Sequence, residues 1–281
     1  MKRVIIKLSI IIVLFFTGFS SLHAQIEHEF SLSGFGGLSC LKYDVAAGNQ
    51  KSGFGGGFGA GYHLSFTPQL GVRTGLEFAL FNAEYNLDGT ECRYMTKDME
   101  GSDFEFRSKA SSYEETQKAS LLQIPLMLQY QTGMFYVAGG VKVGIPISGK
   151  YSNTVASLKN SGYYSNEDYE YTTQQFMGFG AFNGLKSEGD LEFKTVFLLS
   201  FEAGIKYPLS GNMSLYAGAY IDYGLNNMAE KSSLQFVNYN TANPTDFAVN
   251  SVTVSQYSQS AFTDKITPMA IGVKVRLAFG K

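Results

Sequence analysis

The chain has 281 residues, of which 44% are hydrophobic and 16% are charged, and its formal charge is −2. An expected export signal carries three of the 22 Lys and Arg residues and none of the 24 acids, so the mature part has 19 positive and 24 negative charges, or −5. This balance excludes nucleic acid as a partner, which requires a basic face. No mature stretch is apolar enough for a membrane-spanning helix.

The first 24 residues have the pattern of a secretory signal peptide. Basic residues flank an apolar run over 10–16, and small and polar residues follow up to Ala24. We predict cleavage after Ala24, which leaves one domain over 25–281. The alternative, an N-terminal membrane anchor, is disfavoured because the apolar run is short for a spanning helix.

Three strands are predicted in the first third of the mature chain, over 30–38, 54–66 and 72–80. In the second, Phe, Ala, Tyr and Leu alternate with Gly, His and Ser. A period of two is the mark of a β-strand with two unlike faces. The turn at 67–69 joins the second strand to the third, and the polar stretch after Asn86 shows no sustained periodicity.

Five further strands follow, over 122–130, 135–145, 197–207, 215–223 and 269–281. Pro125 lies inside the fourth strand, where it cannot donate to the ladder, so we expect a local bulge there. The last strand puts Val273, Val275 and Leu277 on one face and Lys274 and Arg276 on the other. An apolar face toward lipid and a charged face inward are what a closed barrel in a membrane requires.

The connections alternate between short and long. A few residues follow strands two, four and six, whereas the polar segments 86–117, 148–194 and 224–267 follow strands three, five and seven. This alternation is typical of an outer-membrane barrel with short periplasmic turns. We therefore predict an all-β fold, a transmembrane antiparallel up-and-down β-barrel of eight strands, with long extracellular loops and both termini in the periplasm.

A ten-stranded barrel is the alternative. Leu234, Phe236 and Tyr239 precede Val249, Val252 and Val254 across an Asn-Pro-Thr-Asp turn, and this pattern could form one more hairpin. We prefer eight strands, with these residues extending strands seven and eight.

Charged residues on the predicted inner faces define a candidate site. We expect five basic and three acidic side chains to form a structural or pore-lining charge network in the lumen: Arg73, Glu77, Lys142, Glu202, Lys206, Asp222, Lys274 and Arg276. Charges in a narrow interior are costly unless paired, and eight strands leave a lumen that side chains fill. A salt-bridge network that plugs the barrel is thus favoured over a gated solute path.

Catalytic, cofactor-binding and metal sites are not predicted. His63 and Ser65 share the predicted inner face near Arg73 and Glu77, and a lipid-modifying enzyme using His63 is the weak alternative. No Cys and His spacing fits a metal site. Cys40 and Cys92 fall on the same predicted side of the membrane, where an oxidising compartment permits a disulfide, and two unrelated thiols are the other interpretation.

Several of these segments resemble the porin-like outer-membrane β-barrel domain common in Bacteroidetes. The resemblance rests on 122–126 (LQIPL), 136–140 (YVAGG), 204–209 (GIKYPL), the Gly-rich second strand and the Ala24-Gln25 boundary. It covers the mature chain and implies a small OmpA- or OmpX-type barrel in the cell envelope. One member group, named after PorT, is associated with protein secretion. Barrels often end on an aromatic residue read by the assembly machinery, whereas here Gly280 and Lys281 follow Phe279.

The sequence therefore predicts a monomeric, non-enzymatic outer-membrane barrel that acts as a structural or binding scaffold. Its partners would be membrane lipid, the barrel-assembly machinery and an extracellular ligand or protein at the loops. Tyrosines next to carboxylates at 163–171 could bind calcium, a glycan or a protein, although a solvated loop is the simpler explanation. The alternatives are a gated porin or secretion component and a soluble lipid-binding barrel with its apolar faces inward.

Overall fold

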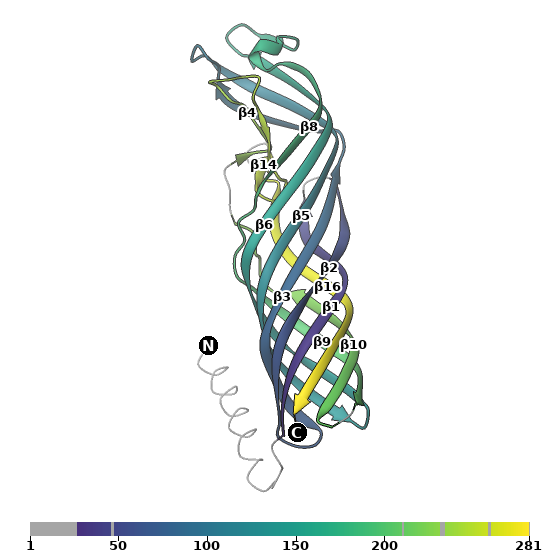
Figure 1. The fold of residues 1–281 in the computed structure, drawn as a ribbon. Coiled ribbons are helices and arrows are strands. Elements are labelled where there is room, and N and C mark those ends of the chain that lie inside the picture. The colour runs from purple at the N-terminus through teal and green to yellow at the C-terminus, as the bar shows by residue number, and fades with distance from the viewer. Residues whose placement is uncertain (1–26, 46–47, 210, 231–233, 258–259, 281) are drawn as a thin grey trace, which may run out of the picture.

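The computed structural model describes residues 27–45, 48–209, 211–230, 234–257 and 260–280 (Figure 1). The predicted signal peptide lies outside these ranges. The long strands are β1 (Glu27–Val45), β2 (Asn49–Ser65), β3 (Leu70–Leu87), β5 (Asp103–Thr132), β6 (Phe135–Tyr164), β9 (Val196–Pro208), β10 (Met213–Gly224) and β16 (Thr263–Gly280). The shorter elements are β4 (Thr90–Lys97), β7 (Tyr169–Tyr171), the 3-10 helix η1 (Gln175–Met177), β8 (Gly180–Asp190), β11 (Leu234–Gln235), β12 (Val237–Asn238), β13 (Ala248–Val249), β14 (Ser255–Tyr257) and β15 (Ser260–Ala261). Within the described ranges, no helix has the length and apolar character needed to cross a membrane.

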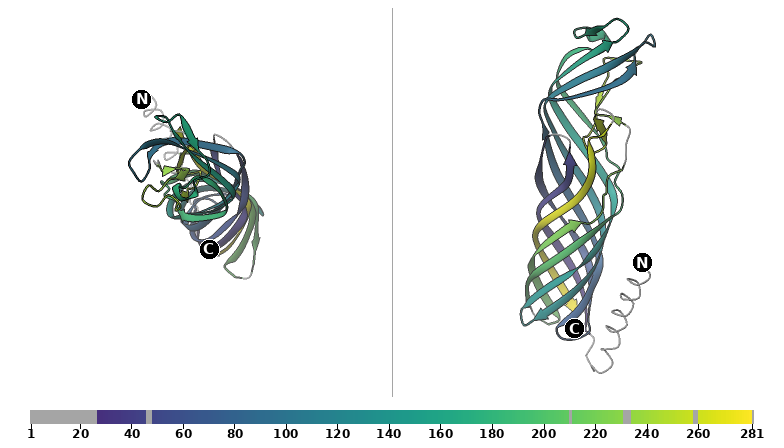
Figure 2. Two further views of the ribbon diagram at one scale, coloured as in Figure 1. Left: turned by 90° about the horizontal axis from the view of Figure 1, so that it is seen from above. Right: turned by 180° about the vertical axis from the view of Figure 1, so that it is seen from behind.

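The long strands close into one antiparallel ring. Each pairs with its neighbour along the chain, in the order β1, β2, β3, β5, β6, β9, β10 and β16, and β16 pairs back onto β1. The view from behind shows the crossing of strands on the two sides of this ring (Figure 2). The eight-stranded up-and-down barrel is confirmed. The ten-stranded alternative is wrong, because β11 to β15 form small separate sheets outside the ring.

Short turns and both ends of the described chain gather at one end of the barrel (Figure 1). Residues 66–69 and 133–134 make two of these turns, and the third joins β9 to β10. Glu29 is the register partner of Gly280 at the same end. The opposite end carries the long connections, as the alternation of link lengths predicts.

The half of the barrel next to the short turns is called the lower barrel. Its outer surface is apolar, and we call this surface the apolar band. Its members are exposed although they are apolar: Phe30, Leu32, Phe58, Leu76, Leu80, Ile124, Leu126, Leu128, Val137, Val141, Ile145, Ile147, Phe201, Ile205, Ile271, Val273 and Val275. Val273, for example, is 66% exposed. On β5 the outward apolar side chains run from Leu122 to Tyr130, which matches the roughly 9–11 residues that a tilted strand needs to cross a bilayer.

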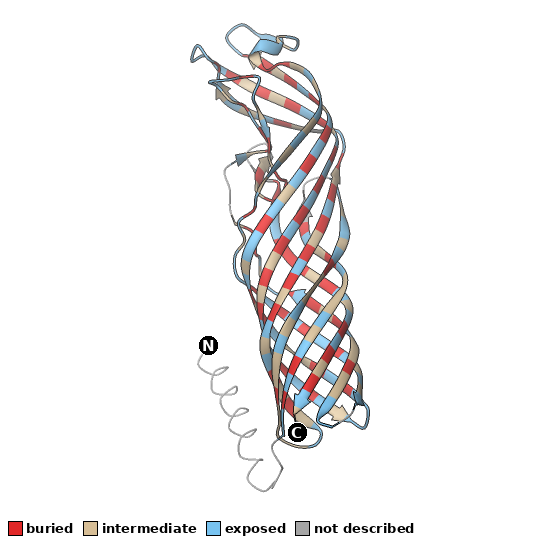
Figure 3. Cartoon of the chain, in the orientation of Figure 1, coloured by how far each residue is buried: buried red, intermediate tan, exposed pale blue. Residues whose placement is uncertain are grey.

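Above the band the two faces exchange their character. Along β3 the inward side chains change from Arg73 and Glu77 to Phe81 and Tyr85, while the outward side turns polar at Glu84. The alternation of buried and exposed residues continues through the change (Figure 3). The lower barrel thus has an apolar outside and a polar inside, and the upper part has the arrangement of a water-soluble protein.

This upper part, the extension, is built from the upper halves of β3, β5 and β6 together with β4, β8 and the described residues of the segment 225–262. From Asp103 to Ser120, β5 alone adds about 60 Å of strand at the usual rise per residue. Val237, Val249 and Val252 of the last connection are buried in a core shared with the strands. The prediction of long loops over 86–117 and 148–194 is therefore corrected: most of these residues are strands.

Two irregularities explain why those strands were missed. Ser112 has a positive φ of 50°, and the parity of buried residues on β5 changes there. The β5–β6 register also shifts between Ser120 and Leu121, which leaves Ile147 as an extra residue at the edge of the apolar band. The expected bulge at Pro125 is wrong, because the register between β3 and β5 stays constant through this residue. Pro125 therefore lies in a regular strand, which only lacks one backbone N–H donor at this position.

Candidate functional site

The structure gathers seven of the eight candidate lumen residues into one buried cluster inside the lower barrel. They come from five strands: Arg73 and Glu77 from β3, Lys142 from β6, Glu202 from β9, Asp222 from β10, and Lys274 and Arg276 from β16. Lys206 lies nearer the short turns and keeps 20% of its side chain exposed. Every second residue of a strand points inward, so these spacings alone bring the charges together.

Glu77 joins two lysines in this cluster. The Lys142 ammonium lies 3.0 Å from Glu77 Oε2 and 2.8 Å from Asp222 Oδ2. Lys274 donates to the other oxygen, Glu77 Oε1. Both carboxylate oxygens of Glu77 are thus occupied by charged donors.

Arg73 and Glu202 form a further ion pair in the same cluster. Arg73 donates through both terminal nitrogens to Glu202, at 2.5 and 3.2 Å, and the Tyr136 hydroxyl donates to the same carboxylate at 2.8 Å. The Arg276 guanidinium stacks 3.8 Å above the ring of Tyr216 and donates to Gln129 Oε1 at 3.0 Å. Bidentate and stacked contacts fix the direction of both arginines.

Glu29 is a member that sequence reasoning missed. It accepts hydrogen bonds from Lys206 at 2.8 Å and Tyr216 at 2.7 Å, and lies 3.3 Å from His63 Nδ1. It was missed because the first strand was predicted to begin one residue later. Among the described contacts His63 makes one with Glu29 and none with Ser65.

The lumen is filled rather than open. A cavity beside Arg73, Glu77, Lys274 and Arg276 has a volume of only about 10 Å³. That is close to one water-sized sphere. The arrangement therefore joins strands across the interior and leaves no room for a solute beside these four residues.

The structure shows the two cysteines unbridged, which matches the interpretation of two unrelated thiols and not the possible disulfide. Cys40 and Cys92 are both free thiols, and burial raises the pKa of Cys92 to about 11. Cys40 is on β1 and Cys92 on β4, and β2, β3 and β5 stand between these strands in the sheet. Sharing one side of the membrane does not bring two side chains within disulfide reach.

The far end of the extension contains a larger hollow, the tip pocket, with a volume of about 360 Å³. It is lined by Asp98, Met99, Glu100, Ser102, Tyr164, Glu167, Tyr171, Gln174, Phe176, Met177, Tyr239 and Pro244. Three of these are acidic and none is basic. Phe176 and Met99 are 74% and 67% exposed, so the pocket has an apolar rim.

Hydrogen bonds hold two of the three acidic side chains of the tip pocket in place. Asp98 accepts the backbone N–H groups of Glu100 and Ser102 at 2.9 Å and the Tyr164 hydroxyl at 2.9 Å. Glu167 accepts the Tyr171 hydroxyl at 2.7 Å. Burial, with Asp98 nearby, raises the pKa of Tyr239 to about 12, so this phenol keeps its proton. The pocket presents carboxylates and aromatic faces, which suit a cation on an apolar body.

The tyrosine-rich segment 163–171 therefore divides between the pocket and the surface. Tyr164, Glu167 and Tyr171 line the pocket, whereas Tyr163 donates to Asp168 at 2.7 Å and Glu170 pairs with Arg107. The sequence pattern could not predict that Asp98 and Phe176 line the same pocket, because they belong to separate connections. Within the part of the chain that the structure describes, no group of three or more His, Cys, Asp or Glu side chains could hold a metal ion.

A fully buried carboxylate ties the last connection to the extension. Glu115 on β5 accepts hydrogen bonds from Tyr113, from Gln117 at 2.5 Å, from Ser251 at 2.5 Å and from the Val252 N–H at 3.2 Å. Burial raises the pKa of Glu115, although these donors act in the opposite direction. We call this contact the Glu115 latch, because it joins β5 to the segment 225–262.

The match to one family model agrees with this architecture. The family model described as "Outer membrane protein beta-barrel domain" matches residues 19–230. Ail, the attachment invasion locus protein of Yersinia pestis, is similar over 90% of this chain and 99% of its own, at 10% identity and a TM-score of 0.33. The translocator domain of the autotransporter NalP from Neisseria meningitidis is similar over 92% and 90%, at 9% identity and a TM-score of 0.22. Among curated proteins there is no match.

Proposed function

The chain belongs to the family of outer-membrane protein β-barrel domains, and from this premise we propose that it is a non-enzymatic scaffold that binds a partner through its extension. Its place is the bacterial outer membrane. The proposal puts the short turns and both termini in the periplasm and the extension outside the cell. It also takes the protein to be a monomer whose contacts are lipid, the assembly machinery and an extracellular ligand.

One contrast carries the proposal. The lumen holds a void of about 10 Å³ among buried charged side chains, whereas the tip pocket offers about 360 Å³ at the far end of the β-structure. Binding sites are commonly found where a rigid scaffold displays connections to solvent. A gated path, the alternative function, would require the buried ion pairs of Glu77 and Glu202 to separate.

The tip pocket defines the class of partner. Asp98, Glu100 and Glu167 supply negative charge with no basic residue among the lining groups, and Phe176 supplies an exposed ring. We therefore propose a cationic group on an aromatic or aliphatic body, such as an arginine or lysine side chain of an extracellular protein. Narrower membership in the Bacteroidetes porin-like group, including its PorT-like members, is part of the proposal and rests on the motifs at 122–126, 136–140 and 204–209.

A peptide containing arginine and tryptophan tests this proposal, because the protein itself has no tryptophan and the peptide gives the whole tryptophan signal. We expect saturable binding to the protein in detergent, weakened about tenfold in the double variant Glu100→Gln/Phe176→Ala, as expected for a lost ion contact and a lost ring. The matched control is Glu114→Gln/Met95→Ala, which changes an exposed acid and an exposed apolar residue elsewhere on the extension. Equal losses in both variants, or no binding by the unmodified protein, would contradict the proposal.

A further inference from the structure

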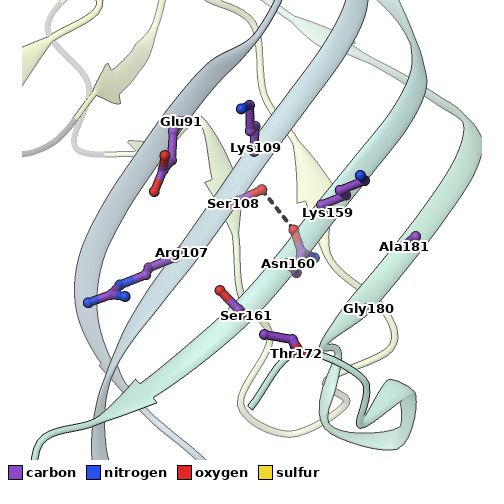
Figure 4. A pocket seen from close by; sticks show the side chains of 10 residues that line it. All are labelled: Glu91, Arg107, Ser108, Lys109, Lys159, Asn160, Ser161, Thr172, Gly180 and Ala181. Carbon is purple, nitrogen blue, oxygen red and sulfur yellow. Dashed lines mark hydrogen bonds between the residues drawn. The ribbon is translucent and has the colours of Figure 1, made fainter. Parts of the chain in front are cut away.

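A second pocket lies on the extension, lined by other residues than the tip pocket, with a volume of about 310 Å³. It lies over four neighbouring strands, with Glu91 from β4, Lys109 from β5, Lys159 from β6 and Ala181 from β8 in register with one another. Figure 4 shows the two lysines on adjacent strands together with Arg107, Ser161 and Thr172. We call it the side pocket.

Lys109 and Lys159 are direct cross-strand partners, so their side chains leave neighbouring strands on the same face of the sheet. Like charges directly opposite on neighbouring strands are destabilising unless something neutralises them. Both lysines are exposed, and neither ammonium has a carboxylate within 4.0 Å among the described residues. The charge of this lysine pair is therefore not neutralised by any carboxylate of the described residues.

The other charges of the side pocket are already paired. Arg107 contacts Glu105 at 2.5 Å and Glu170 at 3.1 Å, and it lies over the Tyr163 ring. The Glu91 carboxylate lies 2.8 Å from Arg93, so its charge is offset outside the pocket. What the pocket offers a ligand is the two lysines, with the exposed Thr172 hydroxyl nearby.

The height of the side pocket above the membrane decides where a ligand comes from. On β6 the apolar band ends at Ile147, and Lys159 lies about 40 Å further along the strand at the usual rise per residue. Even with the tilt usual in such barrels this leaves roughly 30 Å, several times the Debye length of about 8 Å at physiological salt. Phosphate groups of the lipid surface therefore do not reach the lysines.

We propose that the side pocket binds an oxyanion group, a phosphate or sulfate, carried by an extracellular polyanion such as an acidic polysaccharide. The inference rests on the proposed placement of the extension outside the cell but not on the tip pocket or its cationic partner. The two pockets have opposite charge preferences and share no lining residue.

The chain contains its own control. Lys118 and Lys150 form a second cross-strand lysine pair on the same two strands, but Lys150 also faces Asp190 on β8, whereas Lys159 faces Ala181. Neither Lys118 nor Lys150 lines the side pocket. The double variants Lys109→Gln/Lys159→Gln and Lys118→Gln/Lys150→Gln thus remove the same charge from the same outer surface.

The test measures the binding of dextran sulfate and of polyphosphate to the protein in zwitterionic nanodiscs. The affinities are determined by calorimetry at two salt concentrations. We expect saturable binding by the unmodified protein, about tenfold or more weaker binding by Lys109→Gln/Lys159→Gln, and nearly unchanged binding by the control pair. Equal weakening in both pairs would show attraction by net charge alone and overturn the proposal, as would unaltered binding in Lys109→Gln/Lys159→Gln.

Two further measurements separate the remaining cases. Nanodiscs with anionic lipid should leave the affinity for dextran sulfate unchanged, whereas competition from the lipid would identify the headgroup as the occupant and contradict the inference. Retained binding of the arginine and tryptophan peptide by Lys109→Gln/Lys159→Gln, with retained heat-modifiable gel mobility, shows that the fold and the tip pocket are intact. Failure of the side pocket is then distinct from failure of the proposed function.

Discussion

Replacing Glu77 by glutamine is expected to destabilise the barrel by about 3–5 kcal/mol, the usual cost of removing one partner from a buried ion pair. Glu77 neutralises Lys142 and Lys274 together, and both lysines are nearly inaccessible to water. After the change Lys142 keeps Asp222, but Lys274 keeps only Glu202, at 3.9 Å. The measurement is the urea midpoint for loss of heat-modifiable gel mobility after folding into lipid vesicles.

Glu84→Gln is the matched control, since Glu84 lies on the same strand but points outward from the extension. An exposed change of this kind should stay within about 0.5 kcal/mol. Adding Lys274→Met to Glu77→Gln should recover part of the loss, because it removes the charge left unpaired. A Glu77→Gln barrel as stable as the unmodified one would show that the lumen charges do not hold the strands together.

Replacing Glu115 by alanine is expected to free the segment 225–262 from the extension. The change leaves the buried donors of Tyr113, Gln117, Ser251 and Val252 without this acceptor, and each such loss costs about 1–3 kcal/mol. Limited proteolysis should then cut within 225–262 at least tenfold faster while the lower barrel stays resistant. The control is Glu114→Ala on the same strand, whose side chain is exposed. Equal cleavage of the two variants would contradict the latch.

The same latch has a pH dependence of known sign. Because the pKa of Glu115 in the folded chain is raised above its ordinary 4.5, the folded state binds the proton more tightly than the unfolded state. The stability this contributes is fully present below pH 4.5 and is lost as the pH rises through the raised pKa. Cleavage within 225–262 should accordingly increase with pH in the unmodified protein, and Glu115→Gln should remove this increase.

The lower barrel could be predicted from the sequence because one rule governs it. Alternation of Val273 and Val275 with Lys274 and Arg276 fixes both the strand and its two faces, and the ring follows from the short links. The extension follows the opposite rule, with Phe81 and Tyr85 inward on β3. A search for apolar residues facing outward therefore finds nothing above Leu80. The positive φ at Ser112 and the extra residue Ile147 also interrupt the alternation of inward and outward residues. The strands of the extension are therefore hard to recognise from the sequence pattern.

Candidate sites divide in the same way. The spacing of charges along strands predicts which side chains enter the lumen. It does not predict that Glu77 joins two lysines, or that Glu29 contacts Lys206 and Tyr216. The tip pocket unites Asp98, Tyr164, Phe176 and Tyr239 from four separate segments, and the Glu115 latch joins residues 136 positions apart along the chain. Contacts of this range depend on how the last connection packs, which no local pattern encodes.

The exchange of faces at the top of the apolar band is the central claim, and spin-label accessibility along β5 tests it most directly. Labels would be placed one at a time on the outward positions Leu128, Leu126, Ile124, Lys118 and Thr116, with the protein in lipid bilayers. We predict that oxygen, which concentrates in lipid, reaches the three band positions, and that a water-soluble nickel complex reaches Lys118 and Thr116. Nickel access at Leu126, or oxygen access without nickel at Thr116, would contradict the account.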